Sequence, residues 1–131
     1  MTLNELERTI LDESLSDLLA FIQGGIPHLK NTSAEDINQN TLAIASAKMK
    51  LKKISAETDM GFTLQEMKVM YWALSDLRDT TLEYLDSAPI SDPNRNTAVD
   101  SQKICNRLLR ALRNLFLEQG IDIQQLFPQN L

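Results

Sequence analysis

The sequence contains few of the residues that form cross-links and tight turns. Cys105 is the only cysteine among 131 residues, which excludes a disulfide within the chain and is typical of a reducing compartment. The four glycines and four prolines are too few for many turn-linked strands, so they favour long helices. No apolar run approaches the roughly 20 residues of a membrane-spanning helix, and the first residues lack the basic and apolar regions of a secretory signal. We therefore expect a cytoplasmic protein with no membrane segment.

Residues that carry catalysis or bind metals are equally scarce. His28 is the only histidine and follows Pro27 in a polar connection, where we interpret it as a loop residue. No Glu-x-x-His pair for a helical two-metal site and no glycine-rich phosphate loop occurs in the sequence. Cys105 falls on the apolar side of its helical segment, as a small core residue does. We therefore expect no enzyme, no metal and no cofactor.

Apolar residues recur at intervals of three and four in four long segments, which is the period of one helix face. Residues with N-capping side chains stand at the start of each segment, and the third start, Thr63-Leu64-Gln65-Glu66, is a full capping box. Glycine or proline follows the first, third and fourth segments. The prediction is a single helical domain, 1–131, with helices at about 2–23, 33–56, 63–88 and 97–119 and a short turn at about 122–127.

Helices of similar length joined by short connections favour an all-α fold, an antiparallel up-down-up-down four-helix bundle with a short C-terminal helical turn or docked tail. The first and third segments are net acidic, whereas the second and fourth are net basic. If each helix packs beside the next one in the chain, and the fourth beside the first, every helix has neighbours of opposite net charge. Because each exposed ion pair contributes only a few tenths of a kcal/mol, this pattern is a tendency rather than a proof.

Some apolar residues fall outside the stripe that a bundle helix buries. In the third segment Trp72 lies about 140° from the centre of the seam on a helical wheel, with Val69 and Asp76 on the same outer side. In the second segment Leu42 and Met49 form a second apolar line. The C-terminal tail or a loop can cover such residues, and a tryptophan can fold over its neighbours at a helix boundary. The alternative is a protein interface, because tryptophan is enriched among the residues that dominate binding energy and contiguous apolar surface usually has a partner.

Basic residues are also concentrated on the fourth segment, where Lys103, Arg107 and Arg110 share one side and Arg113 lies nearby. Their simplest role is to face the acidic helices or water. A nucleic-acid surface is the alternative, although the net charge of −5 and the lack of interleaved aromatic residues count against it. The leading hypothesis is a small non-enzymatic protein-interaction module of the inhibitor, immunity, chaperone or adaptor type that binds another protein or itself as a homo-oligomer. The second hypothesis is a nucleic-acid-associated accessory protein that uses basic faces of the second and fourth segments.

Overall fold

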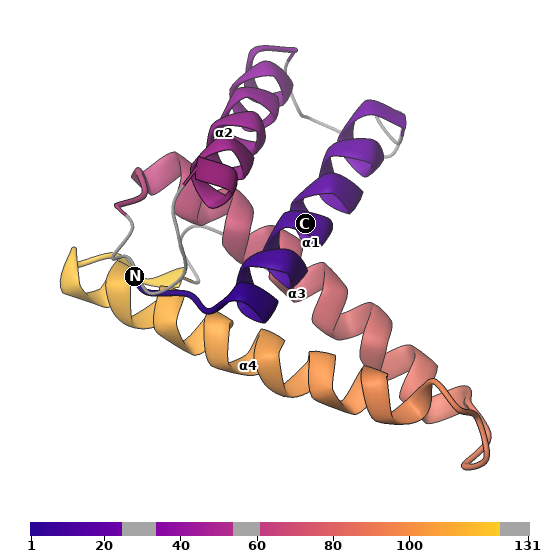
Figure 1. Ribbon diagram of the computed structural model, residues 1–131. Coiled ribbons are helices and arrows are strands. Elements are labelled where there is room, and N and C mark those ends of the chain that lie inside the picture. Colours follow the sequence, from indigo (N-terminus) through magenta and orange to yellow (C-terminus); the bar gives the residue numbers. More distant parts are fainter. Residues whose placement is uncertain (25–33, 54–60, 124–131) are drawn as a thin grey trace.

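The computed structural model describes residues 1–24, 34–53 and 61–123, and within them the fold is all-α. Four helices pack against each other: α1 (Glu5–Gly24), α2 (Ala34–Lys53), α3 (Leu64–Ser87) and α4 (Arg95–Glu118). Figure 1 shows them as two antiparallel pairs, α1 beside α2 and α3 beside α4, with one pair crossing over the other. The prediction of an all-α four-helix bundle is confirmed.

Helix α3 lies at the centre of this arrangement and contacts all three other helices. Helix α1 packs mainly on α3 and α2 and contacts α4 far less. The helix neighbours therefore differ from those expected from charge, because the acidic helices α1 and α3 are in direct contact. Apolar burial between these two helices outweighs the weak preference that surface charges supply.

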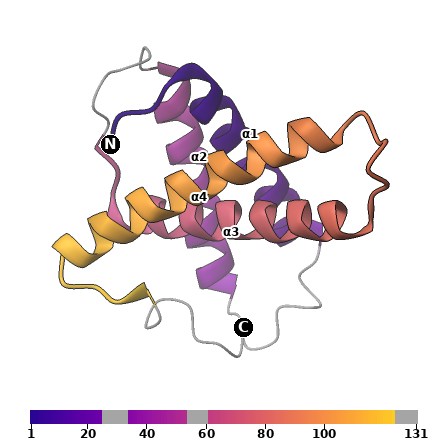
Figure 2. The same cartoon turned by 90° about the horizontal axis from the view of Figure 1, so that it is seen from below.

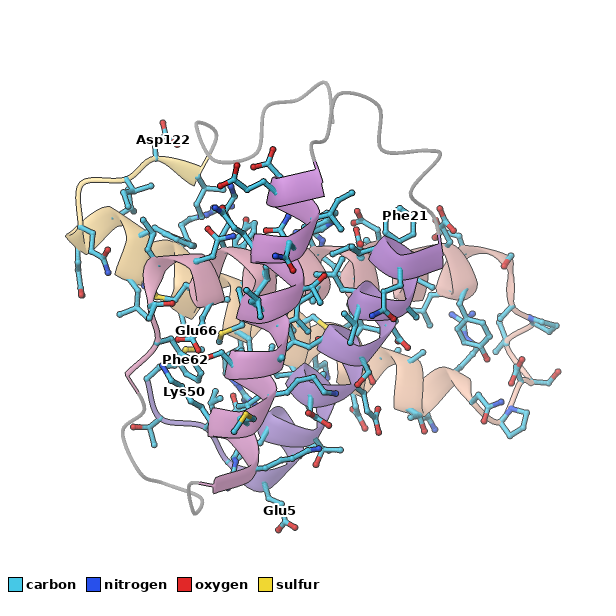
Figure 3. The ribbon with its side chains drawn as sticks, turned by 90° about the horizontal axis from the view of Figure 1, so that it is seen from above. Glu5, Phe21, Lys50, Phe62, Glu66 and Asp122 are labelled. Carbon is cyan, nitrogen blue, oxygen red and sulfur yellow. The ribbon has the colours of Figure 1, made fainter. Side chains whose placement is uncertain are left out.

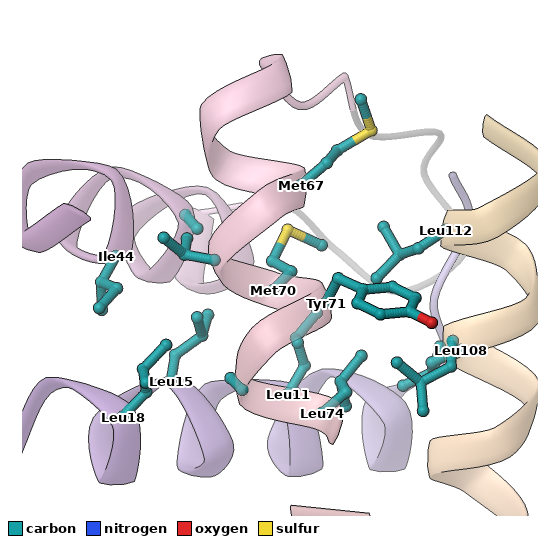
Figure 4. Close-up of a cluster of buried hydrophobic side chains, with 14 of the residues drawn as sticks. Leu11, Leu15, Leu18, Ile44, Met67, Met70, Tyr71, Leu74, Leu108 and Leu112 are labelled. Carbon is teal, nitrogen blue, oxygen red and sulfur yellow. The ribbon is translucent and has the colours of Figure 1, made fainter. Parts of the chain in front are cut away.

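The core is formed by buried side chains from all four helices (Figure 4). Leu11 and Leu15 of α1 meet Met70 and Leu74 of α3, and all four are fully buried. On the other side of α3, the Tyr71 ring packs edge-on against Phe116 of α4, with 6.3 Å between ring centroids. The fully buried members of the same cluster also include Ile44, Ala47, Cys105 and Leu112.

Helix α1 begins at Glu5, three residues later than predicted, because its capping box is built on Asn4 and not on Thr2. The Asn4 side chain accepts the Glu7 backbone N–H at 2.8 Å, and the Glu7 carboxylate accepts the Asn4 backbone N–H at 3.0 Å. The Asn-x-x-Glu spacing gives the same reciprocal arrangement as the Ser/Thr box and satisfies two of the otherwise unpaired N–H groups.

The capping box predicted at Thr63 and Glu66 is confirmed, with both reciprocal hydrogen bonds present. Helix α4, by contrast, begins at Arg95, so the cap expected at Thr97 lies inside the helix. The chain enters α4 through a turn in which the Asp92 carboxylate accepts the Asn94 N–H at 2.9 Å. Arg95 secures this turn because its guanidinium donates to the carbonyls of Leu85 and Ala88 at the end of α3.

The far end of the α3–α4 hairpin extends past the α1–α2 pair (Figures 1 and 2). Beyond Leu74, the only buried residue of α3 is Thr81, and no residue of α4 before Ile104 is buried. At the opposite end, Gly120 ends α4 with a φ of 74°, as its predicted capping role requires. Ile121 and Ile123 then pack against the core. The predicted cap at Ser33, the His28 connection, the helix end at 54–56 and the turn at 124–127 lie outside the described residues.

Candidate functional site

The outer side of α2 exposes the two apolar residues that the sequence singled out as a possible interface. Leu42 is 62% exposed and Met49 is 54% exposed. Ala45, between them on the same side of the helix, is also exposed. The opposite side of α2 is buried in the core through Ile44, Ala47 and Leu51. Helix α2 thus has one apolar stripe facing inward and a second, shorter one facing outward.

The three residues proposed on α3 do not share one surface. Val69 is fully buried, so its expected position outside the bundle was wrong. The reason is the central position of α3, which is covered by three helices and therefore buries a wider arc than the single stripe assumed for a bundle helix. Trp72 is half-buried and packs against the core, whereas Asp76 is exposed.

The carboxyl group of Asp76 is nevertheless perturbed. Desolvation by the surrounding atoms, and then the nearby negative charge of Asp79, raise its pKa above the ordinary value of 3.8. Both effects disfavour the charged form of the carboxyl group. Trp72 and Asp76 lie four residues apart in α3, about one helical turn, but the buried Val69 does not share their surface.

Glu66 is the centre of a polar cluster between α2 and α3 (Figure 3). Its side chain is only 2% exposed, and one carboxylate oxygen accepts hydrogen bonds from Lys50 Nζ at 2.6 Å and from the Thr63 N–H at 2.8 Å. The other oxygen accepts the Ser46 hydroxyl at 2.6 Å. Lys50 Nζ also lies 5.7 Å from the centroid of the Phe62 ring, within the range of a cation–π contact.

These contacts determine the protonation of Glu66. Burial raises the pKa of the carboxyl group, but hydrogen bonds from Lys50, Ser46 and Thr63, together with the Lys50 charge, outweigh it and leave the pKa below 4.5. The sequence predicted the capping role of Glu66 but not its second role as an ion-pair partner. The signal that could have revealed it is the run of lysines on the helix preceding this capping box.

Glu7, the other capping-box glutamate, has the same double role. Its second carboxylate oxygen accepts Arg107 Nε of α4 at 3.0 Å, although the Arg107 side chain stays 59% exposed. A further ion pair joins Lys48 of α2 to Asp12 of α1 at 3.2 Å. Together with Lys50–Glu66, each of these ion pairs joins a net acidic helix to a net basic one, and for Arg107 this is the role expected from the sequence.

Helix α4 runs across one face of the molecule (Figure 2), and four of its five basic residues are exposed to solvent. Lys103, Arg107, Arg110 and Arg113 are all exposed, and Arg107 is held by Glu7. Two lysines of α2 are placed differently, because Lys48 and Lys50 bind acidic side chains of α1 and α3, whereas Lys52 is exposed. The exposed cations are thus concentrated on α4.

Two shallow grooves lie elsewhere on the described surface. One, of about 420 Å³ between α1 and α2, is lined by Glu5, Arg8, Thr9, Asp12, Glu13, Leu51 and Lys52. In this groove the Arg8 guanidinium donates to the Leu51 carbonyl near the end of α2. The other, of about 290 Å³ between α3 and α4, is lined mostly by hydroxyl and amide side chains: Thr80, Thr81, Tyr84, Asn94, Thr97, Ala98 and Ser101. Neither lining includes a cysteine or a histidine.

Cys105 is fully buried in the core, as the sequence predicted. Burial, only partly opposed by the charge of Arg78, raises the pKa of its thiol to about 11. At neutral pH the group is therefore a thiol and not the nucleophilic thiolate. In the ranges 1–24, 34–53 and 61–123 no group of three potential ligand side chains is placed to hold a metal ion.

None of the helices in these same ranges is long and apolar enough to cross a membrane. Comparisons with protein-family models, curated proteins and solved structures give no match for this chain.

Proposed function

We propose that this chain is a small protein-interaction module that acts by binding another protein or a second copy of itself, without catalysis. The observation that carries the proposal is the exposed line of Leu42, Ala45 and Met49 on α2. Burying a large apolar side chain contributes roughly 1.5–3 kcal/mol. Two such residues on one face of a regular helix therefore provide binding energy to any partner that covers them.

The helix that carries this line is held firmly in place. Its inner side is buried in the core, and Lys48 and Lys50 attach it to α1 and α3 through ion pairs. A surface that is already ordered loses little conformational entropy on binding. This preorganisation supports a binding role for the outer side of α2.

The test compares Met49→Glu with Ile90→Glu. Ile90 is 93% exposed in the connection between α3 and α4, so its substitution adds the same charge at a site distant from α2. We expect Met49→Glu to remove the binding of a partner in affinity purification from the native host, or to remove self-association, while Ile90→Glu has no effect. Equal binding by both variants and the unaltered protein would overturn the assignment to α2.

Trp72 and Asp76 are a separate part of the proposed interface. Trp72→Phe keeps an aromatic ring against the core and removes only the indole N–H and part of the surface, so the fold should be retained. Loss of partner binding in this variant, with unchanged thermal unfolding, would support an anchor at Trp72. Unchanged binding would restrict the interface to α2.

A nucleic-acid-associated role is the second candidate, and the exposed cations of α4 are the observation that favours it. It predicts binding that weakens steeply as salt increases, because each phosphate contact releases counterions. Reversing Arg110 and Arg113 to glutamate should abolish a gel shift at low salt. A protein that gives no shift at low salt would dismiss this candidate.

A further inference from the structure

The exposed residues of α2 follow a regular order along the helix. Glu35, Leu42 and Met49 recur every seven residues, and Asn38, Ala45 and Lys52 each follow three residues later. All six are exposed. At 100° per residue they occupy an arc of about 100° on the helix surface. Together they form a continuous stripe, here named the outer α2 stripe.

This stripe is acidic at its beginning, apolar in its middle and basic at its end. Glu35 opens it in the first turn of the helix, and Lys52 closes it in the last. Neither side chain forms an ion pair with any other residue in the part of the chain that the structure describes. A surface with opposite charges at its two ends is complementary to a copy of itself turned end for end.

We infer that the outer α2 stripe is a homodimer interface in which α2 packs antiparallel against α2 of a second copy of this chain, related by a two-fold axis. The inference rests on the proposed function and names the partner. A two-fold axis brings the same patch of each copy together, so each favourable contact occurs twice.

The register follows from the charges. An axis passing between residues 43 and 44 places Glu35 of each copy opposite Lys52 of the other. The same register places Leu42 opposite Ala45, where the small side chain lets the two helices approach closely. Met49 then lies opposite Asn38, and its flexible side chain can adapt to that neighbour. One register therefore satisfies both the charged ends and the apolar middle.

The opposite orientation of the two helices is disfavoured. In a parallel pair, Glu35 would face Glu35 and Lys52 would face Lys52, so both ends would repel. The dipoles of the two helices would also lie side by side in the same direction, whereas an antiparallel pair opposes them. Charges flanking an apolar seam are a general means of setting helix orientation.

The interface is small, since one helix face from each copy contributes less than the roughly 800 Å² per partner of a standard interface. Affinity in the range of about 10 μM to 1 mM is therefore expected. Sedimentation equilibrium of the full chain over that concentration range should show the mass rising from 14.8 kDa towards twice that value. A mass of 14.8 kDa at every concentration would overturn the inference.

Charge reversal tests the orientation and register. In a dimer of Glu35→Lys, the new lysine of each copy lies opposite Lys52 of the other. In a dimer of Lys52→Glu, the new glutamate lies opposite Glu35. Each variant should therefore dimerise at least about tenfold more weakly than the unaltered chain. When the two variants are mixed, the introduced lysine of one copy faces the introduced glutamate of the other at one end of the interface. The unaltered lysine and glutamate face each other at the other end, so the mixture should associate about as well as the unaltered protein. A mixture no stronger than the separate variants would overturn the antiparallel register.

Two controls separate this effect from lost stability. Glu118→Lys and Lys103→Glu make the same charge changes at exposed positions of α4 and should leave the association unchanged. Thermal unfolding of each variant detects any effect of Glu35→Lys on the start of α2. Rescue in the mixture also requires folded chains, because a destabilised helix in one copy is not repaired by a charge on another.

The outcomes also separate the inference from the proposed function. A chain that stays monomeric but binds a different purified protein through Met49 would overturn the homodimer and leave the interaction module intact. If the chain stays monomeric and Met49→Glu also leaves partner binding unchanged, both the homodimer and the proposed interaction surface on α2 are overturned.

Discussion

Lys50 Nζ lies 2.6 Å from Glu66 Oε1, the carboxylate oxygen that also caps the start of α3 by accepting the Thr63 N–H. One side chain thereby fixes both the first turn of α3 and the position of α2 against it. The two effects are coupled, because the hydrogen bond that orients the carboxylate for capping also orients it for the lysine.

Replacing Lys50 with methionine should destabilise the fold by about 1–2 kcal/mol, since the nearly buried Glu66 carboxylate keeps Ser46 and Thr63 but loses its cation. Chemical denaturation measures the change in the free energy of unfolding. The control is Lys103→Met, which removes a lysine that is exposed on α4 and should cost less than about 0.5 kcal/mol. Equal losses in the two variants would show that the ion pair contributes nothing.

The lowered pKa of Glu66 predicts a dependence of stability on pH. Its folded-state pKa lies below 4.5, so the folded state binds this proton more weakly than the unfolded state does. The stabilising contribution is therefore complete above the unfolded-state value and is lost as the pH falls through the folded-state value. The Glu66→Gln variant should therefore lose less unfolding free energy between about pH 7 and about pH 3 than the unaltered protein does. Urea titrations at the two pH values would measure this difference. If unfolding free energy falls by the same amount between these pH values in Glu66→Gln and in the unaltered protein, the prediction is wrong.

The first helix offers a direct test of which residue caps it. Asn4→Ala removes the side chain that accepts the Glu7 N–H and should cost about 1 kcal/mol of unfolding free energy. Thr2→Ala changes an exposed residue outside the helix and should cost less than about 0.5 kcal/mol. A larger loss for Thr2→Ala than for Asn4→Ala would restore the cap that the sequence first suggested.

Val69 provides a test of the central position of α3. Val69→Ala removes two methyl groups from a fully buried site and should destabilise the protein by about 2 kcal/mol through lost burial and the cavity left behind. Val99→Ala makes the same change where the side chain is 36% exposed, with an expected cost below about 1 kcal/mol. Similar, small losses at both positions would mean that the α3 surface around Val69 is open to solvent.

Local patterns in the sequence predicted the helices and the capping box of α3, because spacing and capping side chains act over a few residues. The position of Val69 could not be predicted in this way. A helical wheel gives the direction of a side chain but not how many neighbours surround the helix, and α3 has three. The wheel did separate Leu42 and Met49 from the core, since α2 is covered on one side only. The interface assignment at Trp72 and Asp76 stays a prediction.

The distribution of buried residues along the α3–α4 hairpin also bears on how the molecule opens. Helix α3 contacts the three other helices, but beyond Leu74 its only buried residue is Thr81, and the Arg95 bonds to Leu85 and Ala88 join the two helices at the far end of the hairpin. Amide hydrogens in this distal part should exchange with solvent through local opening, whereas those around Met70 and Leu112 should exchange only when the whole domain unfolds. The far end of the hairpin can therefore unfold locally while its inner end stays packed in the core.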